Sequence, residues 1–147
     1  NGGTYGYQST EWADAIATAM QEEAVVEMTA DIEYNESNRN LKVDITSKAI
    51  DEMNDTYSLV VCIMEDNIVG KQIINGVGTV NDYVHRHVFR GTINGTWGED
   101  FSINEGEKVE REFTQALEPT WNKEQLSIVA FVYNDNGVQQ AVRIIKK

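Results

Sequence analysis

An alternation of apolar and polar residues with a period of two is the feature that most constrains this chain. Along residues 26–34 the even positions are apolar, and the odd positions are glutamate, aspartate or threonine. Residues 41–46 alternate in the same way. Successive side chains of a strand point to opposite faces, so each segment predicts a strand with one dry and one wet face. The Asn- and Ser-containing stretch 35–40 predicts the turn that joins the two strands into a hairpin.

The excess of isoleucine and valine over leucine favours strands along the rest of the chain. The 147 residues include thirteen isoleucines and fifteen valines but only four leucines. Branching at Cβ restricts χ1 and suits a pleated sheet better than a helix. An all-helical bundle is therefore excluded.

Further strands can be placed from apolar runs between turn signals. Residues 57–64 are apolar on both faces and predict a central strand. Residues 107–117 fit either a strand or a single helical turn, which Pro119 ends. The other expected strands cover about 68–74, 82–93, 125–133 and 138–145, with breaks at Asn75-Gly76, Asn94-Gly95 and 134–137. About eight strands without long helical crossovers predict a mainly β, antiparallel β-sandwich, immunoglobulin-like or jelly-roll-like.

One helix is expected ahead of the strands. Trp12, Ile16 and Met20 recur every four residues in an alanine-rich segment, and Ser9 or Thr10 can cap it. We therefore expect a helix from about 11 to 23. Residues 1–24 form an N-terminal loop and helix, and residues 25–147 form the sandwich domain.

Net charge, the length of apolar runs and cysteine content exclude several classes of partner and of structural feature. Twelve basic and twenty-four acidic residues give a net charge of −12, which excludes nucleic acid and anionic lipid surfaces as main partners. No apolar run approaches 18 residues, so no direct membrane insertion is expected. The single cysteine, Cys62, excludes an internal disulfide and lies in an apolar run, where it is expected to pack as a small hydrophobe.

Two histidines form a candidate metal site. His85 and His87 are two residues apart and would share one face of the expected strand, with Asp82 reaching from its end. Because the chain has no other histidine, the remaining ligands would have to be distant carboxylates. The alternative is that both imidazoles stack against neighbouring aromatic side chains in a half-buried sheet. No cofactor is predicted.

Two arginines and two tryptophans are candidate ligand-binding residues. Arg86 and Arg90 would lie on the opposite strand face and could grip a carboxylate, or could pair with the chain's own acidic residues. Trp97 and Trp121, with Tyr133, could form a sugar-stacking platform, or could belong to the core or its rim.

Motifs for catalysis are missing from the chain. It contains no Gly-x-Ser-x-Gly and no His-Glu-x-x-His, and Gly76-Val77-Gly78 lacks the third glycine of a dinucleotide site. We therefore expect a chain that is not an enzyme.

Several segments together resemble one known family. The run 82–90, then Trp97-Gly98-Glu99, then 129–132 before the last hairpin resemble the Omp28 family of outer-membrane proteins and lipoproteins of Bacteroidetes. Residues 64–68, followed by Gln72, fit the same pattern, and the resemblance covers about 12–140. Family members carry a lipid-anchor signal and often a thioredoxin-like region ahead of this domain. The resemblance implies that the helix at 11–23 is the joint to such a region.

The resemblance implies a place in the outer membrane, on the cell surface or in the periplasm. It suggests a non-enzymatic module of a lipoprotein that serves protein interaction, adhesion or reception, with a host or envelope protein or a glycan as its partner. Such a module should expose an aromatic or apolar patch on one sheet or at the loop ends. The alternatives are an accessory domain of a periplasmic thioredoxin-like or metal-binding protein, and a carbohydrate-binding module.

Overall fold

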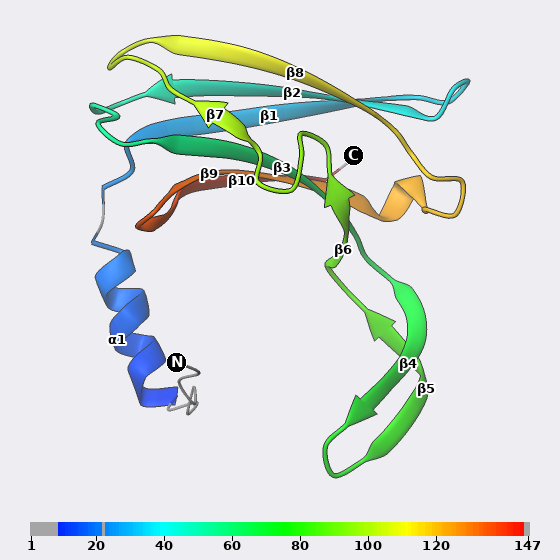
Figure 1. Cartoon of the computed structure of the whole chain (residues 1–147). Helices are drawn as coiled ribbons and strands as arrows, with labels where there is room; N and C mark the ends of the chain where they lie inside the picture. Colours follow the sequence, from blue (N-terminus) through cyan, green and yellow to red (C-terminus); the bar gives the residue numbers. More distant parts are fainter. Residues whose placement is uncertain (1–8, 22, 146–147) are drawn as a thin grey trace.

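Two antiparallel sheets pack face to face in the computed structural model, which describes residues 9–21 and 23–145 (Figure 1). The three-stranded sheet has the order β1-β2-β8, with β1 at Val26–Asn35, β2 at Asn40–Ala49 and β8 at Lys108–Ala116. The five-stranded sheet contains β10 (Gly137–Ile145), β9 (Leu126–Asn134), β3 (Tyr57–Glu65) and β6 (Val88–Thr92), and β7 (Glu99–Phe101) pairs with the first part of β3. The predicted mainly β, antiparallel class is confirmed.

The core lies between the two sheets, where the dry faces of the predicted strands meet. Val26 and Ile45 from the small sheet meet Leu59, Ile63 and Ile128 from the large one, and each is at most 1% exposed. Burying a side chain of this size contributes about 1.5–3 kcal/mol. The alternation in the sequence therefore identified the core side of β1 and β2 correctly.

Cys62 packs as expected in the central strand. It is buried on β3, and this burial raises the pKa of its thiol. A thiol in this setting is poorly reactive, which fits the predicted packing role.

The prediction of one strand over about 82–93 is wrong. The structure has β5 (Gly78–His85) and β6, separated at 86–87, where His87 takes a φ of 53°. The segment 107–117, which was ambiguous, is strand β8. The three-residue strand β7 was missed because so short a segment carries no visible period. Among the described residues there are thus ten strands, and a 3₁₀ turn at Lys123–Gln125 precedes β9.

The helix begins earlier and ends earlier than predicted. Helix α1 spans Ser9–Ala19, so residues 20 and 21 are not helical, and residue 22 lies outside the described residues. Its apolar stripe does not enter the core: Trp12, Ile16 and Met20 are 58%, 59% and 81% exposed. In the described ranges, no helix has the length and apolar character needed to cross a membrane.

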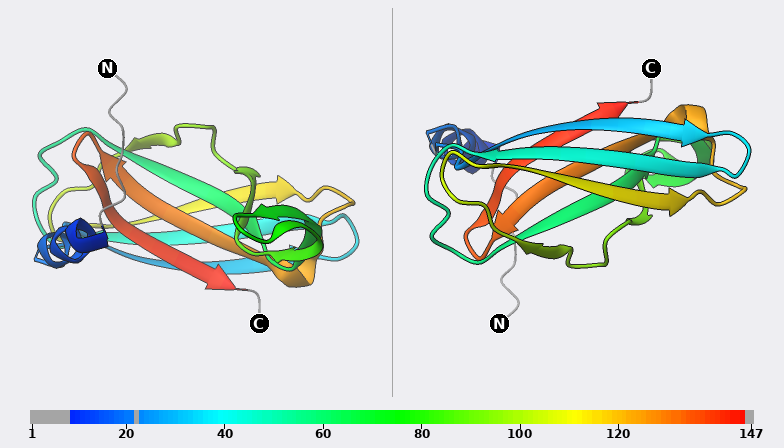
Figure 2. Two further views of the ribbon diagram at one scale, coloured as in Figure 1. Left: turned by 90° about the horizontal axis from the view of Figure 1, so that it is seen from below. Right: turned by 90° about the horizontal axis from the view of Figure 1, so that it is seen from above.

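Two elements leave the sandwich on the same side. Helix α1 extends from one end, and the hairpin formed by β4 (Ile68–Ile74) and β5 extends from the other (Figure 1). In the view from below, the strands of the large sheet lie between them (Figure 2, left). The outward face of that sheet is therefore flanked by both projections.

Candidate functional site: the β4–β5 arm and its root

The hairpin of residues 68–85, here called the arm, continues the β3–β6 hairpin beyond the edge of the sandwich. Glu65 pairs with Val88, and Ile68 pairs with His85. Residues 66–67 and 86–87 therefore lie opposite one another, and the strand register continues across the bend. We call these four residues the root of the arm.

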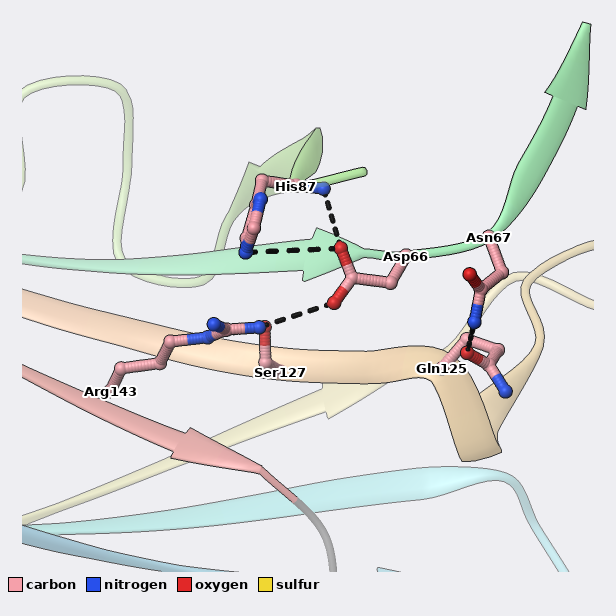
Figure 3. Close-up of polar contacts among 6 residues, drawn as sticks. All are labelled: Asp66, Asn67, His87, Gln125, Ser127 and Arg143. Atoms are coloured by element: carbon pink, nitrogen blue, oxygen red, sulfur yellow. Dashed lines mark hydrogen bonds and ion pairs between the residues drawn. The ribbon is translucent and has the colours of Figure 1, made fainter. Parts of the chain in front are cut away.

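The root bends because both crossing strands leave extended geometry. Asn67 and His87 have φ angles of 61° and 53°, in the left-handed region that asparagine and histidine adopt more readily than most residues. Asp66 holds the two crossings together, since the backbone N–H of His87 donates to its Oδ1 at 2.6 Å. Arg143 of β10 donates to the other carboxylate oxygen at 3.2 Å (Figure 3). One carboxylate thus ties the arm to the edge of the large sheet.

These contacts favour the ionised form of Asp66. The backbone hydrogen bond from His87 is the main cause that lowers its pKa, and the neighbouring charges of His87 and Arg143 act in the same direction. Partial burial opposes this shift. We call the contacts of Asp66 with His87 and Arg143 the clamp. The clamp is therefore strongest when the Asp66 carboxyl is ionised.

Replacing Asp66 by asparagine should destabilise the protein in a pH-dependent way. A lowered folded-state pKa contributes stability above about pH 4, the ordinary pKa of an aspartate, and this contribution disappears as pH falls through the folded value. Asp66→Asn should thus be less stable than the parent at pH 7 in urea unfolding, and the difference should shrink toward pH 2.5. Asp82→Asn is the matched control, because exposed Asp82 makes no hydrogen bond or ion pair with the described residues. A gap between parent and Asp66→Asn that stays constant with pH would contradict the clamp.

An open hollow lies beside the root and gathers several polar side chains. Asn67 donates to the side chain of Gln125, which fixes one wall (Figure 3). Arg86 borders the hollow from the crossing strand and, unlike Arg143, forms no ion pair with the part of the chain that is described. The lining residues are Asp66, Asn67, Arg86, His87, Gln125, Arg143 and Ile145.

The arm beyond the root exposes branched apolar side chains. Val69, Ile73, Val77 and Val84 are 66%, 78%, 72% and 45% exposed. Val69 and Val84 are direct cross-strand partners, so their side chains lie on the same face of the ribbon. An exposed patch was expected on one sheet or at the loop ends, whereas these four side chains lie on the arm.

The two histidines do not share a strand face. His85 is the last residue of β5, half-buried, with its ring edge-on to Tyr83 at a centroid distance of 5.0 Å. His87 lies in the bend, and exposed Asp82 lies further along the arm. Within the described residues, no group of three or more histidine, cysteine or acidic side chains could hold a metal ion. The structure thus differs from the expected arrangement of His85, His87 and Asp82 on one strand, because β5 ends at His85 and His87 lies in the bend.

Arg90 has a structural partner of its own. Its Nε donates to Glu65 at 2.7 Å, and the Glu65 side chain is only 5% exposed. The Arg90 guanidinium lies 6.0 Å from the centre of the Trp121 ring, and Glu65 also accepts a hydrogen bond from the backbone of Asn122. Arg90 therefore pairs with Glu65 of the same chain. This is the second of the two roles considered for it, the first being to bind the carboxylate of a ligand.

Trp97 and Trp121 lie at opposite ends of β3. The hydroxyl of Tyr133 donates to the carbonyl of Trp97, and Tyr133 pairs with Ser58 at the start of the strand. Trp121 lies near the other end of the strand, where Arg90 contacts its ring and Glu65 accepts from the backbone of Asn122. The two rings therefore do not form one platform. Trp97 is 78% exposed, whereas Trp121 packs against the core.

The loop 93–98 contains two residues whose roles were missed. The side chain of Asn94 accepts from the N–H of Val61 at 3.0 Å and donates to the carbonyl of Leu59 at 2.8 Å. It thereby continues the hydrogen-bond ladder of β3 between β6 and β7. The turn predicted from Asn94-Gly95 is present, since the N–H of Gly98 donates to the carbonyl of Gly95 at 3.1 Å, but the role of the Asn94 side chain as a substitute strand partner was not predicted. Gly98 approaches the same strand, which no local pattern indicates.

Comparison with known proteins places this geometry in a family. No protein with curated annotation matches the chain. A solved structure described as a domain of the outer membrane lipoprotein Omp28 from Porphyromonas gingivalis is 27% identical, with a TM-score of 0.61, and the match covers 84% of this chain and 89% of that one.

HBP35 of Porphyromonas gingivalis shares the fold at 16% identity, with a TM-score of 0.69 over 89% of this chain and 44% of that one. The chain thus spans less than half of that HBP35 chain. The family described as "Outer membrane protein Omp28" matches residues 1–147, the entire sequence. The chain is therefore a member of the Omp28 family, which points to the outer membrane or cell envelope.

Proposed function

We propose that this chain is a non-enzymatic protein-binding domain of an envelope lipoprotein and that the arm contacts the partner protein. The observation that carries the proposal is the exposure of Val69, Ile73, Val77 and Val84 on a two-stranded ribbon outside the sandwich. Membership of an outer-membrane family supports the location, and the arm supports the binding role. Exposed apolar surface of this kind is typical of sites that bind another protein.

The backbone of the arm offers a second means of binding. Strands β4 and β5 pair only with each other in the described part of the chain, so the outer edge of each is open. An isolated two-stranded hairpin is at best marginally stable in water. A partner that adds a strand to either edge would satisfy these backbone groups and bury the neighbouring valine and isoleucine side chains. Such a partner would present an extended apolar segment.

The other functions are less well supported by this geometry. A glycan platform would need Trp97 and Trp121 on one surface, but β3 separates them. A metal-binding role would need more ligands beside His85 and His87. An accessory role beside a thioredoxin-like region would still require a contact surface, and the arm would provide it.

Site-specific photo-crosslinking in cells that make the full-length lipoprotein would test this proposal. A photoreactive residue at Ile73 on the arm should capture a defined protein, because this side chain is 78% exposed at the expected contact. A photoreactive residue at Ile50, 50% exposed on the sandwich, is the matched control and should capture far less. The Val69→Asp substitution should remove the adduct at position 73. Equal capture from both positions, or none from position 73, would refute the binding role of the arm.

Protease treatment of intact and lysed cells would then decide between the two sides of the outer membrane. Digestion of the domain on intact cells would support adhesion or reception of an external protein. Protection until lysis would refute the adhesin form of the proposal and leave a periplasmic partner. Mass spectrometry of the adduct at position 73 should give a partner from the same side.

A further inference from the structure

The outward faces of the two sheets differ sharply in charge. On the three-stranded sheet, the outward positions carry alternating acids and lysines, and Lys42 bridges Asp44 and Glu112 at 3.0 Å each. The six carboxylates of this face are Glu27, Asp31, Glu33, Asp44, Glu110 and Glu112. This is the ordinary solvated face of an antiparallel sheet.

The outward face of the five-stranded sheet carries few charged side chains, and the acidic residues of its short strand β7 lie at one end, beside the first part of β3. Strands β3, β6, β9 and β10 contain one acidic residue, Glu65, and its carboxylate points inward to Arg90. The register places Phe131 between Val60 and Ala141 at the centre of the outward face. We call the outward side of these four strands the uncharged face.

Some residues of the uncharged face are buried by the chain itself, and others are exposed to solvent. The loop 93–98 lies over Val60, which is only 3% exposed, so this end is already covered. Phe89 on β6 is 58% exposed beside its partner Met64. At the other edge Ala141 and Ile145 of β10 are exposed. Arg143 is the only cation of β10, and it is paired with Asp66. The exposed side chains of this face are therefore mostly apolar and gain little from contact with water.

We propose that a second copy of this chain covers the uncharged face and forms a two-fold dimer. Two molecules of net charge −12 repel one another over most of their surfaces. A two-fold interface brings the same patch together twice, so it must be complementary to itself. The uncharged face meets this requirement, because its four strands present no outward carboxylate and the Arg143 cation is paired with Asp66, whereas the acidic face of the small sheet does not. Two sheets can pack face to face at about 10 Å.

The area of the face indicates that α1 belongs to the same interface. Four strands spaced by about 4.8 Å, with about seven residues of 3.3 Å each, give a footprint of about 400 Å². A stable interface buries about 800 Å² on each partner. Helix α1 projects on this side with Trp12 and Ile16 exposed, and Met20 directly after it is exposed too, so this segment can contribute the missing apolar area (Figure 2, left).

Sedimentation equilibrium of the 147-residue chain between about 1 and 100 µM tests the dimer. The parent should form dimers, and 0.5 M salt should strengthen them because it screens the repulsion between the two acidic molecules. Ala141→Glu places a carboxylate on the uncharged face and should raise the dimer Kd at least ten-fold. Thr114→Glu is the matched control, since it adds the same charge at an exposed position of β8 beside Lys42 and should leave the Kd unchanged.

Four results would overturn the proposal. These are a parent that stays monomeric at 100 µM, weakening by salt, a folded Ala141→Glu variant that dimerises like the parent, and loss of the dimer in Thr114→Glu. If Ala141→Glu fails to fold by circular dichroism, Phe89→Ser on the opposite edge of the same face gives the same test. The uncharged face is distinct from the exposed side chains of the arm, so failure of the dimer would leave the proposed function intact.

Discussion

Replacing Gly98 by alanine should be among the most destabilising single substitutions in this chain. A Cβ built at this position lies 2.2 Å from the carbonyl oxygen of Leu59 and 2.8 Å from the Cγ2 of Val60. Both contacts are to the central strand β3, which is held by β9 on one side and by β6 and β7 on the other. The Leu59 backbone cannot move without breaking the ladder, so we expect a loss of about 4 kcal/mol in urea unfolding or failure to fold.

Gly106→Ala separates this clash from backbone strain. Gly106 has a φ of 76°, nearly the 78° of Gly98, but a Cβ there meets no atom within 4 Å. An alanine at this angle should cost only about 1–2 kcal/mol. Equal losses from the two substitutions would show that the close approach of loop 93–98 to β3 is not as described.

Replacing Arg90 by methionine should also be strongly destabilising. The Glu65 side chain is 5% exposed, and Arg90 is its ion-pair partner at 2.7 Å. Removing one partner of a buried pair leaves an uncompensated charge, which typically costs about 3–5 kcal/mol. Arg90 also lies over the Trp121 ring, so part of the loss comes from packing. We expect a loss of about 3 kcal/mol, measured by urea unfolding at pH 7.

An exposed ion pair provides the control for Arg90→Met. Lys108 lies 2.7 Å from Glu110, but the two side chains are 57% and 71% exposed. Pairs of this kind contribute about 0–1 kcal/mol, so Lys108→Met should change stability little. A double variant, Arg90→Met with Glu65→Leu, should recover much of the loss, because it removes the unpaired charge. Additive losses in the double variant would argue against a direct Glu65–Arg90 interaction.

The strands were largely predictable because their signal is local. The period of two along β1 and β2 follows from one dry and one wet face, and the structure confirms it. The apolar run of 57–64 was correctly assigned to a central strand. The same run implied that both faces of the strand are buried. Within the described residues, however, the outward face of the large sheet is buried only in part. A single sequence shows that a face is apolar and does not show what lies on it.

The site was harder to predict because it depends on contacts between distant residues. Asp66 and His87 are 21 positions apart, and Asp66 and Arg143 are 77 apart. Histidine at positive φ has no strong local signal, so 82–93 resembled one strand. Arg90 and Glu65 lie 25 residues apart and become partners only through the β3–β6 register. Local patterns therefore could not predict how the candidate residues of the segment 82–90 lie relative to one another.

The register that continues from β3–β6 across the root into β4–β5 determines how the fold would respond to a mechanical load. A partner that pulls on the arm along its length would transmit tension directly into β3, with no flexible linker between them. Because β3 pairs with β9 along most of its length, its hydrogen bonds would be loaded in shear, and many would have to break together. A pull across the arm would instead open the arm's own hairpin one pair at a time. The direction of pulling would thus decide whether the arm stays attached to the sandwich or its two strands separate.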